Sequence, residues 1–204
     1  MNERTVFINC PFSPDYKEFF EAIVYTVQRS GFVPRCAREN DDSGEVRFEK
    51  ICRIIADSHY GIHDISKTEP DPDSGLPRFN MPLELGLFLG ARNFGGRKHA
   101  RKKSIILDLE LHRYQKFVSD IAGQDIHSHN GEVDQLIVGV AAWLRDEAQD
   151  SKVPGGHKIA TEFKRFRTDL PAIAKSLSLE LDELTFKDLT NIAANWIVSE
   201  NSDA

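Results

Sequence analysis

The chain has 204 residues, of which 40% are hydrophobic and 28% are charged, and its formal net charge at pH 7 is −6. This length and composition are typical of a globular protein with one ordinary domain and a modest appendage. No apolar run approaches the roughly 20 residues that a membrane-spanning helix needs. The negative charge argues against a general nucleic-acid-binding protein, because phosphate contacts need concentrated positive charge. We interpret the single basic cluster, residues 97–103, as a solvated loop.

The three cysteines, Cys10, Cys36 and Cys52, are an odd number in apolar contexts, which is typical of reduced thiols. The N-terminal residues lead directly into a strand-like segment, so we expect no signal peptide. Together these features predict a cytoplasmic protein.

Short apolar segments alternate with amphipathic segments along most of the chain. In chain order, the predicted elements are a strand at 5–10, a helix at 15–30, a strand at 32–37, a helix around 48–55, a strand at 60–65, a helix at 81–93, a strand at 104–109, a short helix at 114–121, a short strand at 124–128 and a helix at 132–147. Periodicity and turn residues mark each of them.

This alternation predicts a parallel sheet with helices on both faces. Right-handed crossovers then give a doubly wound, flavodoxin-like α/β fold of about five strands. In such folds ligands bind beyond the carboxyl ends of the strands. The loops expected there are residues 9–15, 37–46, 64–80 and 108–114.

Residues 150–156 are typical of a hinge, so we divide the chain into an α/β domain, residues 1–150, and a C-terminal helical hairpin, residues 151–204. Two short helices bury little area alone. We expect them to dock on the main domain, on each other or on a second subunit. Residues 156–204 are also a candidate surface for a protein partner.

Residues 80–90, Asn-Met-Pro-Leu-Glu-Leu-Gly-Leu-Phe-Leu-Gly, are the most informative segment. They predict a helix start, with Asn80 as its cap and Pro82 close behind. Glu84 is then a single first-turn carboxylate on an otherwise apolar surface. Gly86 and Gly90 share a helix face and would let another backbone or a ligand come close. Glu84 is a candidate catalytic residue; the alternative is a carboxylate that only suits the helix dipole.

Polar residues collect at the expected ligand-binding edge. The candidate binding residues are Asn9, Pro11, Phe12, Ser13, Arg47, Asp64, Ser66 and Asn80. A carboxylate can accept hydrogen bonds from sugar hydroxyls, attack an anomeric carbon or stabilise an oxocarbenium-like transition state. Arg47 is a candidate phosphate ligand because it opens a helix beside this edge. Asp64 fits a loop-anchoring hydrogen bond as well as a ligand contact.

His127 and His129 do not predict a metal site, because no nearby cysteine or carboxylate group completes a ligand set. We interpret them as solvated or structural histidines. We therefore expect no metal and no resident cofactor.

Three motifs together resemble the nucleoside 2-deoxyribosyltransferase family. Phe7-Ile8-Asn9-Cys10-Pro11-Phe12 resembles the turn after the family's first strand, and His63-Asp64-Ile65-Ser66 resembles its third-strand Asp. Asn80-Met81-Pro82-Leu83-Glu84-Leu85-Gly86 resembles its Asn/Thr-x-x-x-Glu-x-Gly helix start. TIR domains that cleave NAD share this arrangement more loosely. The resemblance covers roughly residues 5–145.

The resemblance implies that the target is the N-glycosidic bond of a nucleoside, a nucleotide or NAD, with NAD as a substrate. It implies Glu84 as nucleophile or transition-state stabiliser, Asp64 near the base or sugar, and Asn9, Pro11, Phe12 and Ser13 around the ligand. The expected activity is that of an N-glycoside hydrolase or (deoxy)ribosyltransferase. Bacterial relatives often act in anti-phage defence or as toxin-like effectors.

The chain departs from the family pattern at Cys10, where a small glycine is common, in its long loop 66–79 and in its helices after Gly156. The alternative function is a non-catalytic nucleotide-binding or assembly module, because a fold does not fix a function. A less favoured alternative is a scaffold that works through its C-terminal helices. Self-association into a homo-oligomer is expected, because the site lies beside a helix face with glycines.

Overall fold

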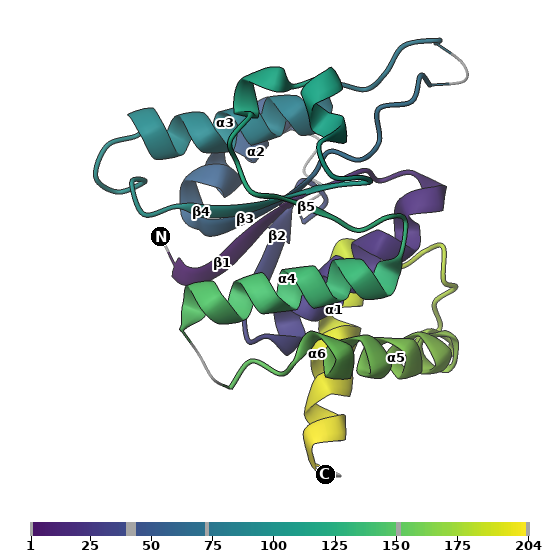
Figure 1. The fold of residues 1–204 in the computed structure, drawn as a ribbon. Coiled ribbons are helices and arrows are strands. Elements are labelled where there is room, and N and C mark those ends of the chain that lie inside the picture. Colours follow the sequence, from purple (N-terminus) through teal and green to yellow (C-terminus); the bar gives the residue numbers. More distant parts are fainter. Residues whose placement is uncertain (1, 40–43, 72–73, 150–151, 203–204) are drawn as a thin grey trace.

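The computed structural model of the protein describes residues 2–39, 44–71, 74–149 and 152–202, and a parallel sheet lies at its centre (Figure 1). The strands are β1 (Asn2–Asn9), β2 (Val33–Cys36), β3 (Ser58–Asp64), β4 (Lys103–Asp108) and β5 (Ile126–Ser128). Their order is β2-β1-β3-β4-β5, and all neighbouring pairs are parallel. This is the flavodoxin-like order, so the predicted α/β fold is confirmed.

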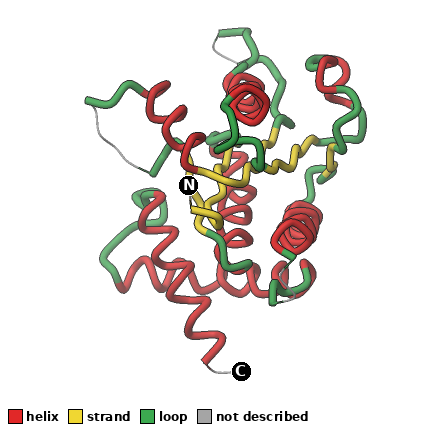
Figure 2. Tube along the Cα trace, turned by 90° about the vertical axis from the view of Figure 1, so that its left-hand side faces the viewer, coloured by secondary structure: helices red, strands yellow, loops and turns green. Residues whose placement is uncertain are grey.

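Helices cover both faces of this sheet. They are α1 (Lys17–Arg29), α2 (Arg47–Asp57), α3 (Asn80–Phe94), α4 (Val133–Ala148), α5 (Gly156–Ser176) and α6 (Phe186–Ser202). Helices α2 and α3 lie on one face, α1 and α4 lie on the other, and α5 and α6 form a further layer outside α1 and α4 (Figure 1). Figure 2 shows the helices on both sides of the strands from a perpendicular direction. Within the described ranges, no helix has both the length and the apolar character needed to cross a bilayer.

The central strands are buried along continuous apolar runs. Val6, Phe7 and Ile8 of β1 are inaccessible to solvent, and residues 105–107 of β4 are equally buried. Such runs are typical of parallel strands, because both faces are covered. β2 lies at the edge of the sheet, as Pro34 predicted.

The start of α3 differs from the prediction. The first helical hydrogen bond runs from the Leu83 N–H to the Phe79 carbonyl, so Phe79 is the cap residue and Asn80 is already helical. The Asn80 side chain makes no capping hydrogen bond. Glu84 therefore lies in the second turn rather than the first, where the helix dipole has little effect.

The segment after β4 also differs from the prediction. Instead of one short helix at 114–121 it forms two 3₁₀ turns, η2 (Arg113–Lys116) and η3 (Ser119–Ile121). Val118 interrupts them, because its backbone is not helical (φ −140°, ψ 60°). A third short turn, η1 (Pro14–Tyr16), precedes α1.

The C-terminal helices dock on the main domain and on each other, the first two of the three arrangements that the sequence left open. Tyr25 of α1 stacks on Phe166 of α5, with ring centroids 5.1 Å apart, and Trp196 of α6 lies 5.7 Å from Phe166. Arg29 of α1 forms an ion pair with Glu162 of α5 at 2.6 Å. These aromatic side chains belong to the same buried cluster as the sheet-facing residues of α1 and α4.

Gly156 permits the close approach of α5 to α4. A Cβ atom at this position would lie 2.6 Å from the Val138 Cα, a distance that real side chains do not reach. Residues 150 and 151 of the expected hinge lie outside the described residues. The tight contact beyond them brings α5 directly onto α4.

If α5 and α6 belong to this core, Phe166→Ala will lower the free energy of unfolding by about 3–5 kcal/mol, the usual effect of removing a buried phenylalanine side chain. Denaturant titration should show a single transition at a lower midpoint. Val198→Ala, on the exposed side of α6, is the matched control and should change stability by less than about 0.5 kcal/mol. A separate early transition for the two helices would contradict the shared core.

Candidate functional site

The candidate site lies where β1 and β3 end side by side in the middle of the sheet. In the order β2-β1-β3-β4-β5, the chain leaves β1 toward one edge of the sheet and β3 toward the other. Folds of this type bind ligands at such a switch point. Asn9 ends β1 and pairs in register with His63, and Asp64 ends β3.

The Asn9 side chain joins three elements at this point. Its amide nitrogen donates to the Met81 carbonyl of α3 at 2.8 Å and lies 3.1 Å from Nδ1 of His63 in β3. A side-chain amide nitrogen can only donate hydrogen bonds, so His63 Nδ1 is the acceptor and Nε2 carries the imidazole proton. Burial lowers the pKa of His63 to about 3, so the ring is neutral. Asn9 thus positions the start of α3 through protein contacts.

His63 depends on a glycine beside it. A Cβ atom at Gly61 would lie 2.6 Å from the His63 Nε2 and 2.9 Å from the Phe88 ring. The Phe88 ring centroid lies 4.9 Å from that of His63, with the two rings steeply inclined. Among the described residues, Nε2 has no hydrogen-bond partner. The imidazole is therefore fully buried and packed against an aromatic ring.

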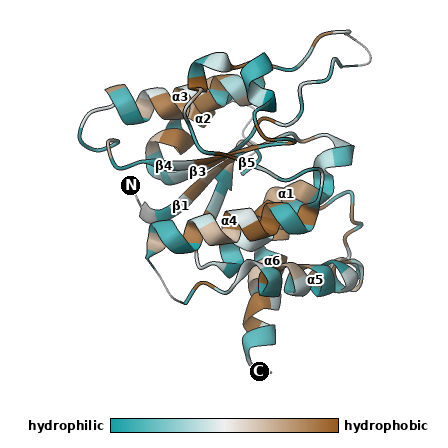
Figure 3. Ribbon diagram, viewed as in Figure 1, coloured by the Kyte–Doolittle hydropathy of each residue, from teal (hydrophilic) through white to brown (hydrophobic). Residues whose placement is uncertain are grey.

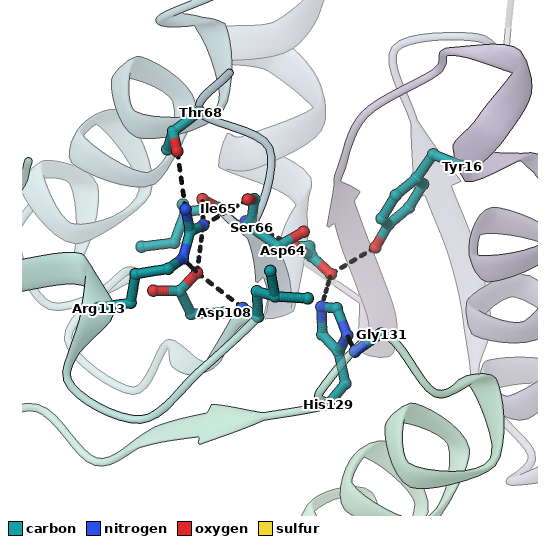
Figure 4. A network of polar contacts seen from close by, with 10 residues as sticks. Tyr16, Asp64, Ile65, Ser66, Thr68, Asp108, Arg113, His129 and Gly131 are labelled. Atoms are coloured by element: carbon teal, nitrogen blue, oxygen red, sulfur yellow. Dashed lines mark hydrogen bonds and ion pairs between the residues drawn. The ribbon is translucent and has the colours of Figure 1, made fainter.

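Asp64 is surrounded by protein groups (Figure 4). The Tyr16 hydroxyl donates to Oδ2, and the Ser66 backbone N–H donates to Oδ1 at 2.8 Å. His129 Nε2 lies 3.2 Å from Oδ2, an ion-pair distance at an angle too poor for a hydrogen bond. The Gly131 N–H donates to the other nitrogen of His129, which leaves the proton on Nε2. These contacts match the loop-anchoring interpretation of Asp64.

A second buried carboxylate, Asp108 at the end of β4, anchors the next loop (Figure 4). Arg113 donates to its Oδ1 from Nε at 2.9 Å, and the same guanidinium donates to the Thr68 hydroxyl at 2.7 Å and to the Ser66 carbonyl. Burial raises the pKa of Asp108, and Arg113 opposes this shift. The network joins the loop after β3 to β4.

Glu84 differs from the other buried carboxylates. Glu21 faces Arg167 at 3.6 Å, and Asp64 and Asp108 have the partners described above. Glu84 is 8% exposed and forms no hydrogen bond or ion pair with any described residue. Burial raises its pKa to about 7, and the charge of Arg47 opposes this shift.

Cys10 lies between these groups. Burial raises the pKa of its thiol, and the carboxylates of Asp64 and Glu84 act in the same direction. Arg38 acts in the opposite direction. The thiol is packed in the core, as expected for a structural cysteine.

The remaining predicted residues take different positions. Ser66 is buried. Its backbone N–H donates to Asp64, and its carbonyl accepts a hydrogen bond from Arg113. Ser13 accepts a hydrogen bond from Lys67 at 3.1 Å, and Pro11 is buried after β1. Arg47 is exposed at the first position of α2, and its charge reaches Glu84. Asn80 is exposed and makes no capping contact.

A cavity of about 390 Å³ lies beside this edge, between the loop after β1 and the start of α6. Phe12, Ser13 and Arg38 line it from the main domain, and Phe186 and Leu189 line it from α6. The Arg38 guanidinium lies 4.8 Å from the centroid of the Phe12 ring. Neither Glu84 nor Asp64 lines this cavity. The predicted residues therefore form two groups, one around Glu84 and one around the cavity.

Sequence reasoning missed Tyr16, Asp108, Arg113 and Arg38. Asp108 carries the clearest signal in the sequence, because it ends a buried strand as Asp64 does. Tyr16 and Arg38 carry no comparable signal, because their roles depend on contacts between distant segments. Within the described ranges, no group of three or more His, Cys, Asp or Glu side chains is placed to hold a metal ion.

Comparison of the chain with protein-family models, with curated proteins and with solved structures finds no match.

If Tyr16 anchors Asp64, Tyr16→Phe will lower the free energy of unfolding by about 1.5–3 kcal/mol, the usual contribution of a hydrogen bond to a charged group. Tyr114→Phe is a matched control, because Tyr114 is also buried and its hydroxyl has no hydrogen bond with a described residue. Chemical denaturation of both variants measures the difference. Equal losses would show that the Asp64 contact adds nothing.

The raised pKa of Glu84 predicts a pH-dependent stability. Between about pH 4.5 and 7 the native carboxyl keeps a proton that the unfolded chain releases, so the free energy of unfolding falls as pH rises. Glu84→Gln removes this fall and should gain up to about 3 kcal/mol relative to the wild type across that window.

Denaturation of both proteins at several pH values tests this expectation. Glu49→Gln, at an exposed position of α2, is the control and should keep the wild-type pH profile. Identical profiles for Glu84→Gln and the wild type would contradict a raised Glu84 pKa.

Proposed function

We propose that the protein breaks the N-glycosidic bond of a nucleoside, a nucleotide or NAD, with Glu84 acting at the anomeric carbon. The observation that carries this proposal is the Glu84 carboxylate, buried at the switch point of the sheet without a protein partner. The side chain is largely buried, but its carboxylate oxygens are not among the fully buried polar atoms, so they are open to a ligand. Groups with perturbed pKa values in such positions are often functional.

The position of Glu84 strengthens this interpretation. The helix-dipole explanation applies to first-turn carboxylates, and Glu84 lies in the second turn. Asn9 fixes the beginning of α3 through the Met81 carbonyl, three residues before Glu84. A carboxylate on an anchored helix keeps a defined direction, which a reaction at one carbon atom needs.

The reaction has two steps. In the first, ionised Glu84 attacks the anomeric carbon, and the bond from this carbon to the base nitrogen breaks, so that the base leaves with the electron pair. A nucleobase then takes a proton from water, whereas the cationic nicotinamide of NAD leaves as a neutral molecule and takes none. In the second, water or an acceptor base attacks the same carbon, loses a proton and releases Glu84. Without the covalent bond, the carboxylate stabilises the oxocarbenium-like charge. Water as acceptor gives a hydrolase, and a base gives a (deoxy)ribosyltransferase.

The other predicted residues divide into supporting and binding roles. Asn9, Asp64 and Ser66 hold β1, β3 and α3 in place as positioning residues. Arg47 is available for a phosphate beside Glu84. The cavity formed by Phe12 and Ser13 with Arg38 offers an aromatic face for a base or for the remainder of a dinucleotide.

The resemblance to nucleoside 2-deoxyribosyltransferases and, more loosely, to TIR domains supports this class of reaction. It rests on the residues around Asn9, Asp64 and Glu84, which lie at or beside one edge of the sheet. A role as a defence or toxin-like effector is the wider proposal that follows from the same resemblance.

One observation favours a second candidate function, a non-catalytic nucleotide-binding or assembly module. The cavity of about 390 Å³ is lined by residues of α1, α6 and the loop after β1, and Glu84 is not among them. A ligand held only there would not meet the carboxylate.

Base release distinguishes the two functions. The wild type should free nicotinamide or a nucleobase from at least one of NAD, nucleosides and nucleoside monophosphates, as measured by chromatography. Glu84→Gln should reduce this rate by a factor on the order of 10² or more, because the charge at the reacting carbon is lost. The wild-type rate should rise with pH toward a plateau above about pH 7, where Glu84 is ionised.

Glu49→Gln is again the matched control and should keep the wild-type rate. Equal release by the wild type and Glu84→Gln would remove Glu84 from the mechanism. An inactive wild type whose melting temperature still rises with nucleotide would support the binding module.

A further inference from the structure

The outward face of α3 carries no charged side chain. Its exposed residues are Asn80, Leu83, Gly86, Asn93 and Phe94. The two charged residues of this helix, Glu84 and Arg92, are buried or half-buried. A helix face in contact with water normally carries charged groups, so this face has the composition of a contact surface.

Helix α5 provides a comparison within the same chain. Among its exposed positions are the charged residues Lys158, Lys164, Arg165 and Asp169. Figure 3 shows the contrast, because the ribbon of α3 is largely brown or pale whereas teal recurs along α5. An exposed face without charged side chains is therefore a feature of α3 and not of every helix in this protein.

Large apolar side chains stand out from the same face. Phe94 is 89% exposed, Phe79 is 69% exposed and Leu83 is 54% exposed, and Leu76 in the preceding loop is 66% exposed. Between them, Gly86 and Gly90 have no atom within 4 Å of the place where a Cβ would stand. The face thus consists of bulky residues at both ends and open space in the middle.

When this face is placed against an antiparallel copy of itself, its leucines lie opposite its glycines. If a second α3 lies antiparallel with a two-fold axis between residues 86 and 87, Phe79 meets Phe94 of the other copy. In the same register Leu83 meets the other copy's Gly90, and Leu87 meets its Gly86. The exposed Leu83 then fills the space that Gly90 leaves open, while the half-buried Leu87 borders Gly86, and the backbones can approach closely.

We propose that α3 is the interface of a homodimer in which two copies of this helix pack antiparallel around Gly86 and Gly90. A two-fold interface needs one patch that complements itself, which the reversed pattern provides. A contact with a different protein would not require the patch to be complementary to itself.

The exposed apolar area is a substantial part of what such a contact needs. Phe79 and Phe94 can each contribute up to roughly 150–250 Å², and Leu76 and Leu83 add to this, against the roughly 800 Å² per partner that a standard interface buries. This exposed area is also as large as the largest apolar patches of ordinary monomers, which are often functional. Glu84 is buried and is not one of the exposed residues of this patch, so the dimer does not depend on the proposed function.

Sedimentation at micromolar concentrations tests the dimer. The wild type should have twice the chain mass of 23.1 kDa, and the double variant Leu83→Lys with Phe94→Lys should have the mass of one chain. Both positions are exposed, so the variant should keep the circular dichroism of the wild type. Val198→Lys places a lysine at an exposed apolar position of α6 and should stay dimeric.

Disulfide formation tests the register. Phe79→Cys mixed with Phe94→Cys should give a cross-linked dimer under mild oxidation, in a background with Cys52→Ser. Phe79→Cys alone should not cross-link if the helices are antiparallel. In a parallel arrangement residue 79 of one copy would lie beside residue 79 of the other, and this variant alone would cross-link. A monomeric wild type, a dimer that persists in the double variant, or cross-linking of Phe79→Cys alone would each overturn the proposal.

Discussion

One side-chain amide holds the centre of this molecule together. The nitrogen of Asn9 contacts the Met81 carbonyl and the His63 ring, so it joins β1, β3 and α3 where the chain changes direction across the sheet. Asn9, Asp64 and Glu84 stand on these three elements, and Ser66 follows β3 directly. A change in this contact would shift α3, and with α3 both the buried carboxylate and the exposed apolar face.

The carboxylates near this point have sharply different surroundings. Asp64 and Asp108 hold neighbouring loops in place through a tyrosine, an arginine and backbone N–H groups. Glu84 has no such group, although it is nearly as buried. Protein groups donate hydrogen bonds to the first two carboxylates, whereas only the more distant charge of Arg47 acts on Glu84. This difference is the physical basis for treating Glu84 as reactive and the two aspartates as supports.

Local patterns in the sequence predict the architecture well and the site only in part. Apolar runs such as residues 6–8 and 105–107 locate the strands, because a covered parallel strand must be apolar. The start of α3 is predicted one residue too late: Asn80 is a good capping residue by type, yet it is already the first residue of the helix. The partners of Asp64 lie far along the chain, at Tyr16 and His129, and no local pattern indicates them. The absence of a partner for Glu84 is likewise visible only once the chain is folded.

The neutral His63 ring has a consequence for how the protein responds to its surroundings. With a pKa of about 3, this imidazole keeps one protonation state throughout the range that living cells experience. The anchor between β1, β3 and α3 is therefore insensitive to acidification. Glu84 lies in α3, three residues after the anchored Met81, and its pKa of about 7 is close to neutrality. A modest fall in pH would therefore protonate Glu84 and remove its charge, while the contacts of Asn9 with His63 and Met81 stay unchanged.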